Sequence, residues 1–329
     1  MTFFSHCRSF AGFIALVLAA ATTAVGETRE GTVRADDGVE LYYRAVGAGP
    51  ETVVIPVAVW LSPHFDSLAG STRRVIYYDP RGRGRSGVGR LEAVSLDRAT
   101  KDLEALRAAL KIHKMVLVGW SGYGMEMAVY ALAHPDRVSR IVQLNPVPPR
   151  LEPFMGARMA GMGKRNDQAA WQRYEQMAKE GAEQRLLCRQ MNRAEAPAWF
   201  AKPAAAAPLI DRVCEWPNEW PDNQGKFFGA FLPSLANLDL RPRLHELRMP
   251  RLIVHGDRDL IPLEGVREWL TGTDNARLLV IEGADHGTFL DAPKAVLDAI
   301  EQFLAGSWPA AASSGGHSSA PRGASHERH

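Results

Sequence analysis

Residues 114–134 read KMVLVGWSGYGMEMAVYALAH and combine a short apolar run, a serine among glycines and a second apolar segment. The run 114–120 is rich in Val and Leu, which is typical of a strand buried on both faces. The segment 122–133 is apolar nearly all round and is followed by Pro135, as expected for a buried helix. This order of strand, sharp turn and helix predicts that the turn presents the Ser121 hydroxyl above the sheet edge.

The glycines around Ser121 only partly follow the Gly-x-Ser-x-Gly pattern of a nucleophile elbow. Gly119 matches the first position, whereas Tyr123 occupies the second, with Gly122 and Gly124 on either side of it. We expect these two glycines to give the turn its backbone freedom and the Tyr123 ring to point towards the substrate pocket. A dinucleotide-binding loop is excluded because the spacing is not G-x-G-x-x-G.

Short apolar strands alternate with helical patterns along most of the chain. A hairpin is predicted around the Asp37-Gly38 turn, and a first amphipathic helix follows Ser95. Continuous Val/Ile/Leu runs indicate further buried strands: TVVIPV (52–57), RRVIYYDP (73–80), SRIVQLNP (139–146), RLIVHGD (251–257) and ARLLVIEG (276–283). This alternation predicts an α/β fold with a mostly parallel sheet flanked by helices.

The stretch 150–248 breaks the alternation, because it is rich in Ala, Arg, Gln, Met and Trp and contains no clear buried strand. We therefore expect a helical insertion there, between core segments 27–149 and 249–306. The tail 307–329 is rich in Ser, Gly, Ala and Pro and is predicted to be disordered.

The first 26 residues have the layout of a secretory signal peptide, with Arg8 before an apolar stretch from Phe10 to Ala21. Cleavage is predicted after Ala24 or Gly26. The alternative is an uncleaved membrane anchor, but the apolar run is shorter than the roughly 20 residues that a span needs. We therefore expect a periplasmic or secreted protein with no stable membrane insertion after cleavage.

Removal of this leader leaves two cysteines, Cys188 and Cys214. In an exported protein they are predicted to form a disulfide, with two buried thiols as the alternative. The formal net charge of +2 gives no electrostatic case for a nucleic-acid partner. The sequence does not determine the oligomeric state.

A serine nucleophile needs a base and a group that orients the base, and both types of residue follow Ser121 along the chain. His286 comes after the last predicted strand, in EGADHG, and Asp257 and Asp259 come after the strand before it, in VHGDRD. Asp259 is preferred because it lies further into the loop. Asp285 is disfavoured because a residue adjacent to His286 cannot easily reach its far ring nitrogen. The first amide of the helix, at Gly122, is the expected oxyanion donor.

Together these segments resemble the α/β-hydrolase family over 31–306. YDPRGRGRSG (78–87), GWSGYG, GDRD and DHG resemble its motifs, and the insertion resembles its helical cap, with a layout similar to the proline-iminopeptidase-like branch. The resemblance implies a serine hydrolase that works through an acyl-enzyme, with no metal or organic cofactor. Relatives often carry His-Gly after the strand 52–57, and placing Val57 and Ala58 on that pair makes Val59 N–H the second oxyanion donor.

The substrate class stays open between two kinds of small molecule. Esters of small or aromatic acids suit the aromatic cap. A proline-iminopeptidase-like aminopeptidase is the alternative, in which Glu215, Glu219 or Asp222 holds the substrate amine. A non-catalytic binding protein on a hydrolase fold is a third reading, which the Ser, Asp, His order disfavours.

Two further expectations concern charged residues near the elbow. Arg81, Arg83 and Arg85 are expected to brace their loop by pairing with carboxylates rather than to bind an anion. Glu126 lies on the otherwise apolar helix that follows Ser121, and we expect it to form a buried ion pair with an arginine.

Overall fold

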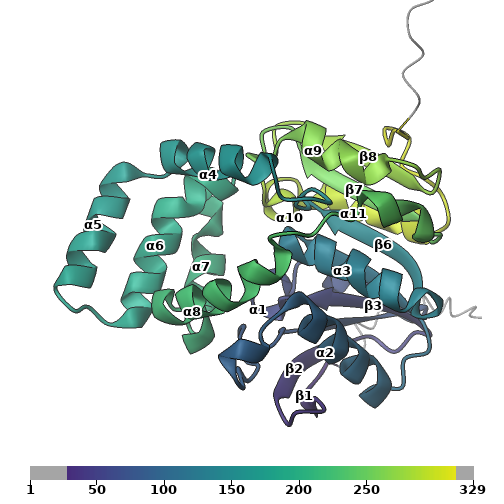
Figure 1. The fold of residues 1–329 in the computed structure, drawn as a ribbon, viewed down its shortest axis with the longest axis horizontal. Helices are drawn as coiled ribbons and strands as arrows, with labels where there is room; N and C mark the ends of the chain where they lie inside the picture. Colours follow the sequence, from purple (N-terminus) through teal and green to yellow (C-terminus); the bar gives the residue numbers. More distant parts are fainter. Residues whose placement is uncertain (1–27, 316–329) are drawn as a thin grey trace, which may run out of the picture.

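The computed structural model describes residues 28–315, and helices flank a mixed β-sheet at its centre (Figure 1). The eight strands of this sheet lie in the order β1-β2-β4-β3-β5-β6-β7-β8. β1 and β2 are antiparallel to their neighbours, and all other pairs are parallel. The strands span Arg29–Arg34 (β1), Glu40–Val46 (β2), Glu51–Pro56 (β3), Arg73–Tyr78 (β4), Met115–Trp120 (β5), Val138–Leu144 (β6), Arg251–Gly256 (β7) and Ala276–Ile281 (β8).

The central strands are buried because helices cover both faces of the sheet. Every residue of β5 and β7 is buried, which agrees with their continuous apolar sequences. On one face, α2 (Leu96–Ala109) and α3 (Gly122–Ala133) contribute side chains such as Leu103 and Tyr130 to the core. On the other, α11 (Pro293–Leu304) contributes Ile300 and Phe303. The predicted mostly parallel α/β sheet is confirmed.

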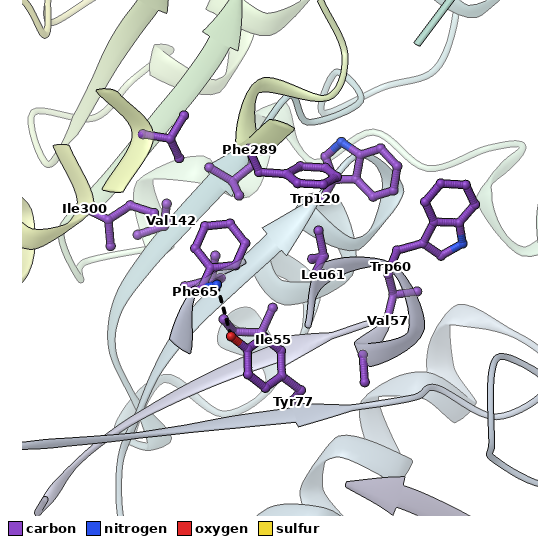
Figure 2. Close-up of a cluster of buried hydrophobic side chains, with 14 of the residues drawn as sticks. Ile55, Val57, Trp60, Leu61, Phe65, Tyr77, Trp120, Val142, Phe289 and Ile300 are labelled. Atoms are coloured by element: carbon purple, nitrogen blue, oxygen red, sulfur yellow. Dashed lines mark hydrogen bonds between the residues drawn. The ribbon is translucent and has the colours of Figure 1, made fainter. Parts of the chain in front are cut away.

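A cluster of aromatic rings lies over the carboxyl end of β5 on the α11 face (Figure 2). The Trp120 ring lies 5.9 Å from that of Trp60, in the short helix α1 (Ala58–Leu61). It also meets Phe289, in α10 (Thr288–Asp291), edge-on at 5.3 Å. These contacts join the loops that follow β3, β5 and β8, so the cluster fixes the edge of the sheet at which Ser121 lies.

The segment between β6 and β7 is helical and forms a layer beside the sheet (Figure 1). A bridge between Arg150 and Asp239 closes its base, and a small helix, α9 (Leu263–Arg267), follows β7. We call residues 150–248 the cap. Its helices are α4 (Phe154–Arg165), α5 (Gln168–Lys179), α6 (Gln184–Trp199), α7 (Ala207–Val213) and α8 (Pro221–Phe231).

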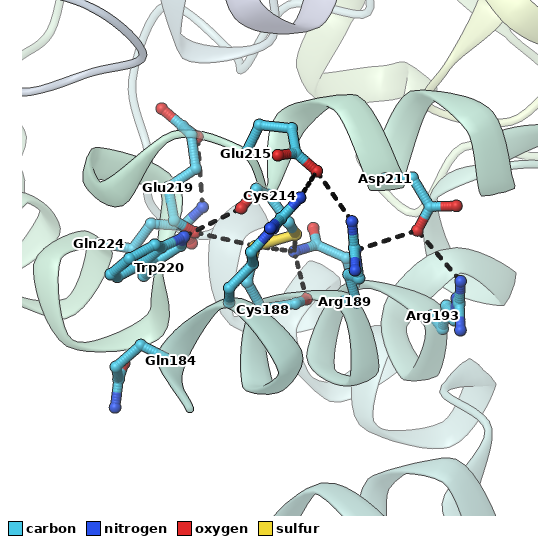
Figure 3. Close-up of a disulfide and its surroundings, with 12 residues drawn as sticks. Gln184, Cys188, Arg189, Arg193, Asp211, Cys214, Glu215, Glu219, Trp220 and Gln224 are labelled. Carbon is cyan, nitrogen blue, oxygen red and sulfur yellow. Dashed lines mark hydrogen bonds and ion pairs between the residues drawn. A yellow bond between two sulfur atoms is a disulfide. The ribbon is translucent and has the colours of Figure 1, made fainter. Parts of the chain in front are cut away.

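A disulfide joins two of the cap helices (Figure 3). Cys188 in α6 and Cys214 at the end of α7 are bonded through their sulfur atoms, as the sequence predicts. The disulfide lies at the start of the segment that carries Glu219 in a 3-10 turn. The covalent bond therefore anchors that turn to α6.

The described part of the tail is ordered, which corrects the prediction of disorder from residue 307. Ser313 exchanges backbone hydrogen bonds of 2.8 and 2.9 Å with Leu278, at the outer edge of β8. The Trp308 ring packs 5.1 Å from the Phe303 ring, and the Arg277 guanidinium lies 5.2 Å from the centre of the Trp308 ring. An edge strand offers unpaired backbone groups, and the segment 307–315 satisfies some of them.

The predicted leader (1–26) and the rest of the tail (316–329) lie outside the described residues. Within 28–315, none of the helices combines the length and apolarity that a membrane span requires.

Candidate active site

Ser121 lies in a strained turn between β5 and α3. Its backbone has φ 56° and ψ −127°, a conformation that residues other than glycine rarely adopt and that costs about 1–3 kcal/mol. The turn is held because Ser121 N–H donates to Leu144 O at 2.9 Å, and Gly124 N–H donates to Ser121 O at 3.0 Å. Gly119 is required by space, since a Cβ there would lie 2.4 Å from the backbone oxygen of Tyr123. The predicted strand–turn–helix context is confirmed.

A chain of hydrogen bonds links Ser121 to a buried carboxylate through one imidazole. His286 Nε2 lies 2.9 Å from Ser121 Oγ, and His286 Nδ1 lies 2.9 Å from Asp259 Oδ2. His286 is 1% exposed, and the Asp259 side chain is fully buried. A hydroxyl, an imidazole and a carboxylate in this order can transfer a proton from the serine and stabilise the resulting imidazolium. The structure thus brings together the three residues that the sequence singles out.

Asp259 is kept ionised by the groups around it. Burial alone would raise its pKa, but the neighbouring His286 lowers the pKa below the usual range of aspartate. Asp259 also accepts hydrogen bonds from Asn145 Nδ2 at 2.8 Å and from Ile261 N–H at 2.9 Å. Asn145 is oriented in turn by Thr288 Oγ1, which donates to its Oδ1 at 2.7 Å. Asn145 follows β6, and its role in holding Asp259 was not predicted from the sequence.

The two disfavoured aspartates lie outside this chain of hydrogen bonds. Asp257 accepts from Gly283 N–H at 2.8 Å in an exposed loop. Asp285 is fully buried, and its carboxylate pairs with Arg165 of α4 at 2.7 Å. The Asp285–Arg165 pair therefore ties the cap to the loop that carries His286.

Aromatic side chains from the core and the cap enclose His286. Trp120 Nε1 donates to His286 O at 2.8 Å, and its ring lies 5.3 Å from the imidazole. Trp199, at the end of α6, meets the imidazole edge-on at 5.3 Å. Gly287 N–H donates to Trp199 O at 2.9 Å, and a Cβ at Gly287 would lie 2.2 Å from the Phe200 ring. The cap thus rests directly on the His286 loop.

The expectation that Val59 N–H is an oxyanion donor is wrong, because this amide is already engaged. It donates to Asp79 Oδ1 at 2.8 Å. Val57 has φ 60°, so the residue that follows β3 adopts the left-handed conformation typical of glycine. The left-handed turn at Val57 sets the direction of the next amide, Ala58 N–H. This amide donates no hydrogen bond within residues 28–315. Gly122 N–H, at the start of α3, likewise donates to no acceptor within that range.

Asp79 joins the turn after β3, which contains the Val59 amide, to the loop after β4. Besides Val59 N–H it accepts Arg85 N–H at 3.0 Å, and it is 1% exposed. Burial raises its pKa to about 7. A Cβ at Gly84 would lie 2.2 Å from its carboxylate, so the glycine at this point allows the loop to fold around Asp79.

The three arginines of the loop after β4 pair with acidic side chains, as predicted. Arg81 binds Asp102 at 2.8 Å, and Arg83 binds Glu219 of the cap at 2.6 Å. Arg85 lies 3.4 Å from Glu30. The expected bracing role of these residues is confirmed.

The expected ion pair of Glu126 is absent, and this prediction is wrong. The Glu126 carboxylate is 2% exposed and accepts a hydrogen bond from Tyr78 Oη at 3.3 Å, with no arginine within ion-pair distance in residues 28–315. Burial raises its pKa to about 8, so near neutral pH the proton stays on this acid.

The same described range contains no group of three or more His, Cys, Asp or Glu side chains arranged to hold a metal ion.

Comparison with known proteins places this arrangement in a family. The model of the alpha/beta hydrolase fold matches residues 50–293. The pimeloyl-[acyl-carrier protein] methyl ester esterase of Aeromonas hydrophila is 25% identical over 272 residues, which cover 78% of this chain and 96% of that protein. The proline iminopeptidase of Lactobacillus helveticus is 34% identical over 116 residues, but these cover only 32% of this chain and 40% of that enzyme.

Among solved structures, the esterase EaEST from Exiguobacterium antarcticum superimposes with a TM-score of 0.65 at 19% identity, over 84% of this chain and all of that one (100%). The sheet order, the helical insertion after β6 and the family match agree with one another. The chain therefore belongs to the alpha/beta hydrolase family, and it is a hydrolase.

Proposed function

We propose that this protein is a serine hydrolase that cleaves carboxylic esters of small molecules through an acyl-enzyme. The observation that carries the proposal is the unbroken series of contacts from Ser121 through His286 to Asp259, with Ser121 held in a strained turn at the start of α3. Such strain persists only where the surrounding structure enforces it, and it is common at reactive residues.

In the proposed reaction Ser121 Oγ attacks the ester carbonyl while His286 Nε2 accepts its proton. Asp259 holds His286 Nδ1–H and stabilises the positive charge that forms on the ring. His286 then returns the proton to the alcohol that leaves. A water molecule, activated by the same imidazole, hydrolyses the acyl-enzyme and regenerates the serine.

The oxyanion of the tetrahedral intermediate would be held by backbone amides. Gly122 N–H lies at the positive end of α3, which favours an anion. Ala58 N–H replaces Val59 N–H as the second proposed donor, since the turn at Val57 leaves it without an acceptor in the described chain. In this scheme Asp79 serves as a positioning residue, because it fixes the neighbouring Val59 amide.

An ester is favoured over a peptide with a free amino terminus because of the contacts and exposure of the three acids that could hold the substrate amine. The buried Glu219 carboxylate receives Arg83 at 2.6 Å and Gly84 N–H at 2.8 Å. Glu215 pairs with Arg185 and with Arg189. Asp222 is exposed. Glu219 and Glu215 are thus occupied by arginines and Asp222 is exposed, so these three acids do not support the aminopeptidase.

We also propose that the protein is exported. The leader-like sequence of residues 1–26 and the Cys188–Cys214 bond support this proposal, because disulfides persist in oxidising compartments. N-terminal sequencing of the protein from periplasmic and culture fractions tests it. A new amino terminus after Ala24 or Gly26 is expected, and a cytoplasmic protein that retains Met1 would contradict it.

The proposed activity is tested with a panel of 4-nitrophenyl esters alongside aminoacyl 4-nitroanilides. Ser121→Ala and His286→Ala should lower kcat for esters by a factor of about 10⁴ or more, since the members of such a triad act together. Asp259→Asn should be severely impaired, whereas Asp257→Asn serves as the matched control and should retain near-normal rates. Faster turnover of the anilides than of every ester would favour the aminopeptidase.

A further inference from the structure

A cavity of about 330 Å³ lies where the core meets the cap, beside the loop that carries Ala58. Its lining combines cationic and aromatic side chains with this loop. Its walls include Tyr42, Arg44, Ala58, Arg85, Arg212 and Trp216. Glu30 and Asp79 are the acids that line it.

Two of the three arginines in this cavity have acidic partners. Arg44 makes two hydrogen bonds to Asp66, at 2.8 and 2.7 Å. Arg85 lies 3.4 Å from Glu30, and its guanidinium stacks between two rings, 4.4 Å from the centre of Tyr42 and 4.5 Å from that of Trp216. These contacts fix both side chains and form a rigid wall.

Arg212, from α7 of the cap, is different because its charge is uncompensated. No ion pair or hydrogen bond of its guanidinium is found within residues 28–315, and its Nη2 is buried without a partner. Burial and the nearby Arg85 charge both lower the pKa of Arg212, so its environment opposes the cation. Asp79 does not compensate it fully, since its pKa is raised to about 7 and its oxygens already accept two amides.

We propose that this cavity binds a carboxylate through Arg212, and that the substrate is an ester that carries such a free carboxylate. The inference rests on the proposed function. It joins two features of the same cavity, an unpartnered guanidinium and the loop whose Ala58 amide faces the reacting carbonyl in the proposed mechanism. A guanidinium is well suited to a carboxylate, which it binds through two parallel hydrogen bonds.

The test compares two esters of similar length, mono-(4-nitrophenyl) glutarate, which is anionic, and 4-nitrophenyl pentanoate, which is neutral. The readout is the ratio of kcat/KM for the first ester to that for the second. The wild-type protein should favour the glutarate, and Arg212→Gln should lower the ratio by about 10- to 100-fold, the range for a lost hydrogen bond to a charged group. Arg212→Lys should retain part of the preference for the anionic ester, because lysine keeps the positive charge but cannot form the two parallel hydrogen bonds of a guanidinium.

Two control variants separate this site from a general effect of cap charge. Arg193→Gln removes an exposed cap arginine that pairs with Asp211 at 3.1 Å, and it should leave both esters unchanged. Arg158→Gln removes another arginine of the cap, whose Nε is buried without a partner and which lies over the Trp199 ring at 5.5 Å. A ratio that falls in Arg158→Gln and not in Arg212→Gln would overturn the proposal.

A binding measurement distinguishes failure of this inference from failure of the proposed function. Calorimetry with glutarate on Ser121→Ala needs no turnover, and it should detect binding that Arg212→Gln abolishes. Hydrolysis of the neutral ester with no glutarate binding and no preference for the anionic ester would refute the carboxylate site and leave the hydrolase standing. Thermal unfolding checks that Arg212→Gln is folded, as expected for removal of a cation with no protein partner in the described chain.

Discussion

The Tyr123 hydroxyl accepts a hydrogen bond from Arg83 Nη1 at 2.9 Å, so the residue in the second glycine position of the elbow is bonded to the arginine that holds the cap. Arg83 pairs with Glu219 through Nε and Nη2, at 3.0 and 2.6 Å. The elbow, the loop after β4 and the cap are therefore joined by one buried polar network. This network explains how a tyrosine fits at the elbow, where its backbone approaches Gly119 and its side chain reaches away to Arg83.

Replacement of Tyr123 should reveal this bond in the stability of the protein. Tyr123→Phe is expected to lower the free energy of unfolding by about 1–3 kcal/mol, since it removes a hydrogen bond to a charged group. Tyr123→Gly should cost more, because it also leaves a cavity. Chemical denaturation of the three proteins measures both steps. Equal stability of the wild type and Tyr123→Gly would show that the ring contributes nothing to the network.

The Arg83–Glu219 pair predicts a large difference between single and double substitutions. Arg83→Met leaves a buried carboxylate without its cation and should lower the free energy of unfolding by about 3–5 kcal/mol. Combining it with Glu219→Leu removes both charges, so the double variant should lose less than the sum of the singles. Arg34→Met is the control, because Arg34 and Glu40 form an exposed pair worth less than about 1 kcal/mol. Additive losses in the buried pair would contradict its coupling.

Glu126 predicts a stability that depends on pH. Its pKa rises from 4.5 in the unfolded chain to about 8 in the fold, so its contribution to stability is complete below pH 4.5 and is lost progressively up to pH 8. Glu126→Gln keeps the shape and cannot ionise. The variant should therefore gain stability relative to the wild type as pH rises, by up to about 5 kcal/mol above pH 8.

Urea denaturation of both proteins at pH 5, 7 and 9 measures this gain. Asp79 is present in both, so its own titration cancels in the comparison. A difference between the two proteins that stays constant across this range would mean that Glu126 ionises freely in the fold.

The disulfide should stabilise the cap. Cys188 and Cys214 are 26 residues apart, and closing such a loop is worth roughly 3–4 kcal/mol through the entropy of the unfolded chain. The double substitution to Ala should lower the melting temperature by several degrees. Non-reducing peptide mapping of the wild type should recover both cysteines in one linked peptide pair, and recovery of two free thiols would refute the bond.

The elements that follow from local pattern were predictable from the sequence. The apolar runs of β5 and β7, the turn at Ser121 and the downstream order of Asp259 and His286 all depend on residue types and their spacing. Parallel strands deliver their following loops to one edge of the sheet, so that order alone brings Asp259 and His286 to Ser121.

The features that depend on exact backbone direction were not predictable. Val57 is β-branched and adopts φ 60°, a conformation that its residue type disfavours, and for this reason we propose Ala58 N–H in place of Val59 N–H as the second oxyanion donor. The partner of Glu126 is a tyrosine of β4, and the partner of Ser313 is the edge of β8, so both are set by tertiary packing. The composition of the tail is typical of disorder. Composition alone cannot reveal that residue 313 pairs with the free edge of β8.

The most direct test of the account is covalent labelling with a fluorophosphonate, followed by mass spectrometry of the intact protein and of its peptides. The wild type should gain one label, located on Ser121, and Ser121→Ala should gain none. His286→Ala should be labelled far more slowly, because the hydroxyl loses the imidazole that lies 2.9 Å away. Labelling of a folded Ser121→Ala at the wild-type rate, or attachment of the label to another residue, would contradict the claim that Ser121 is the nucleophile.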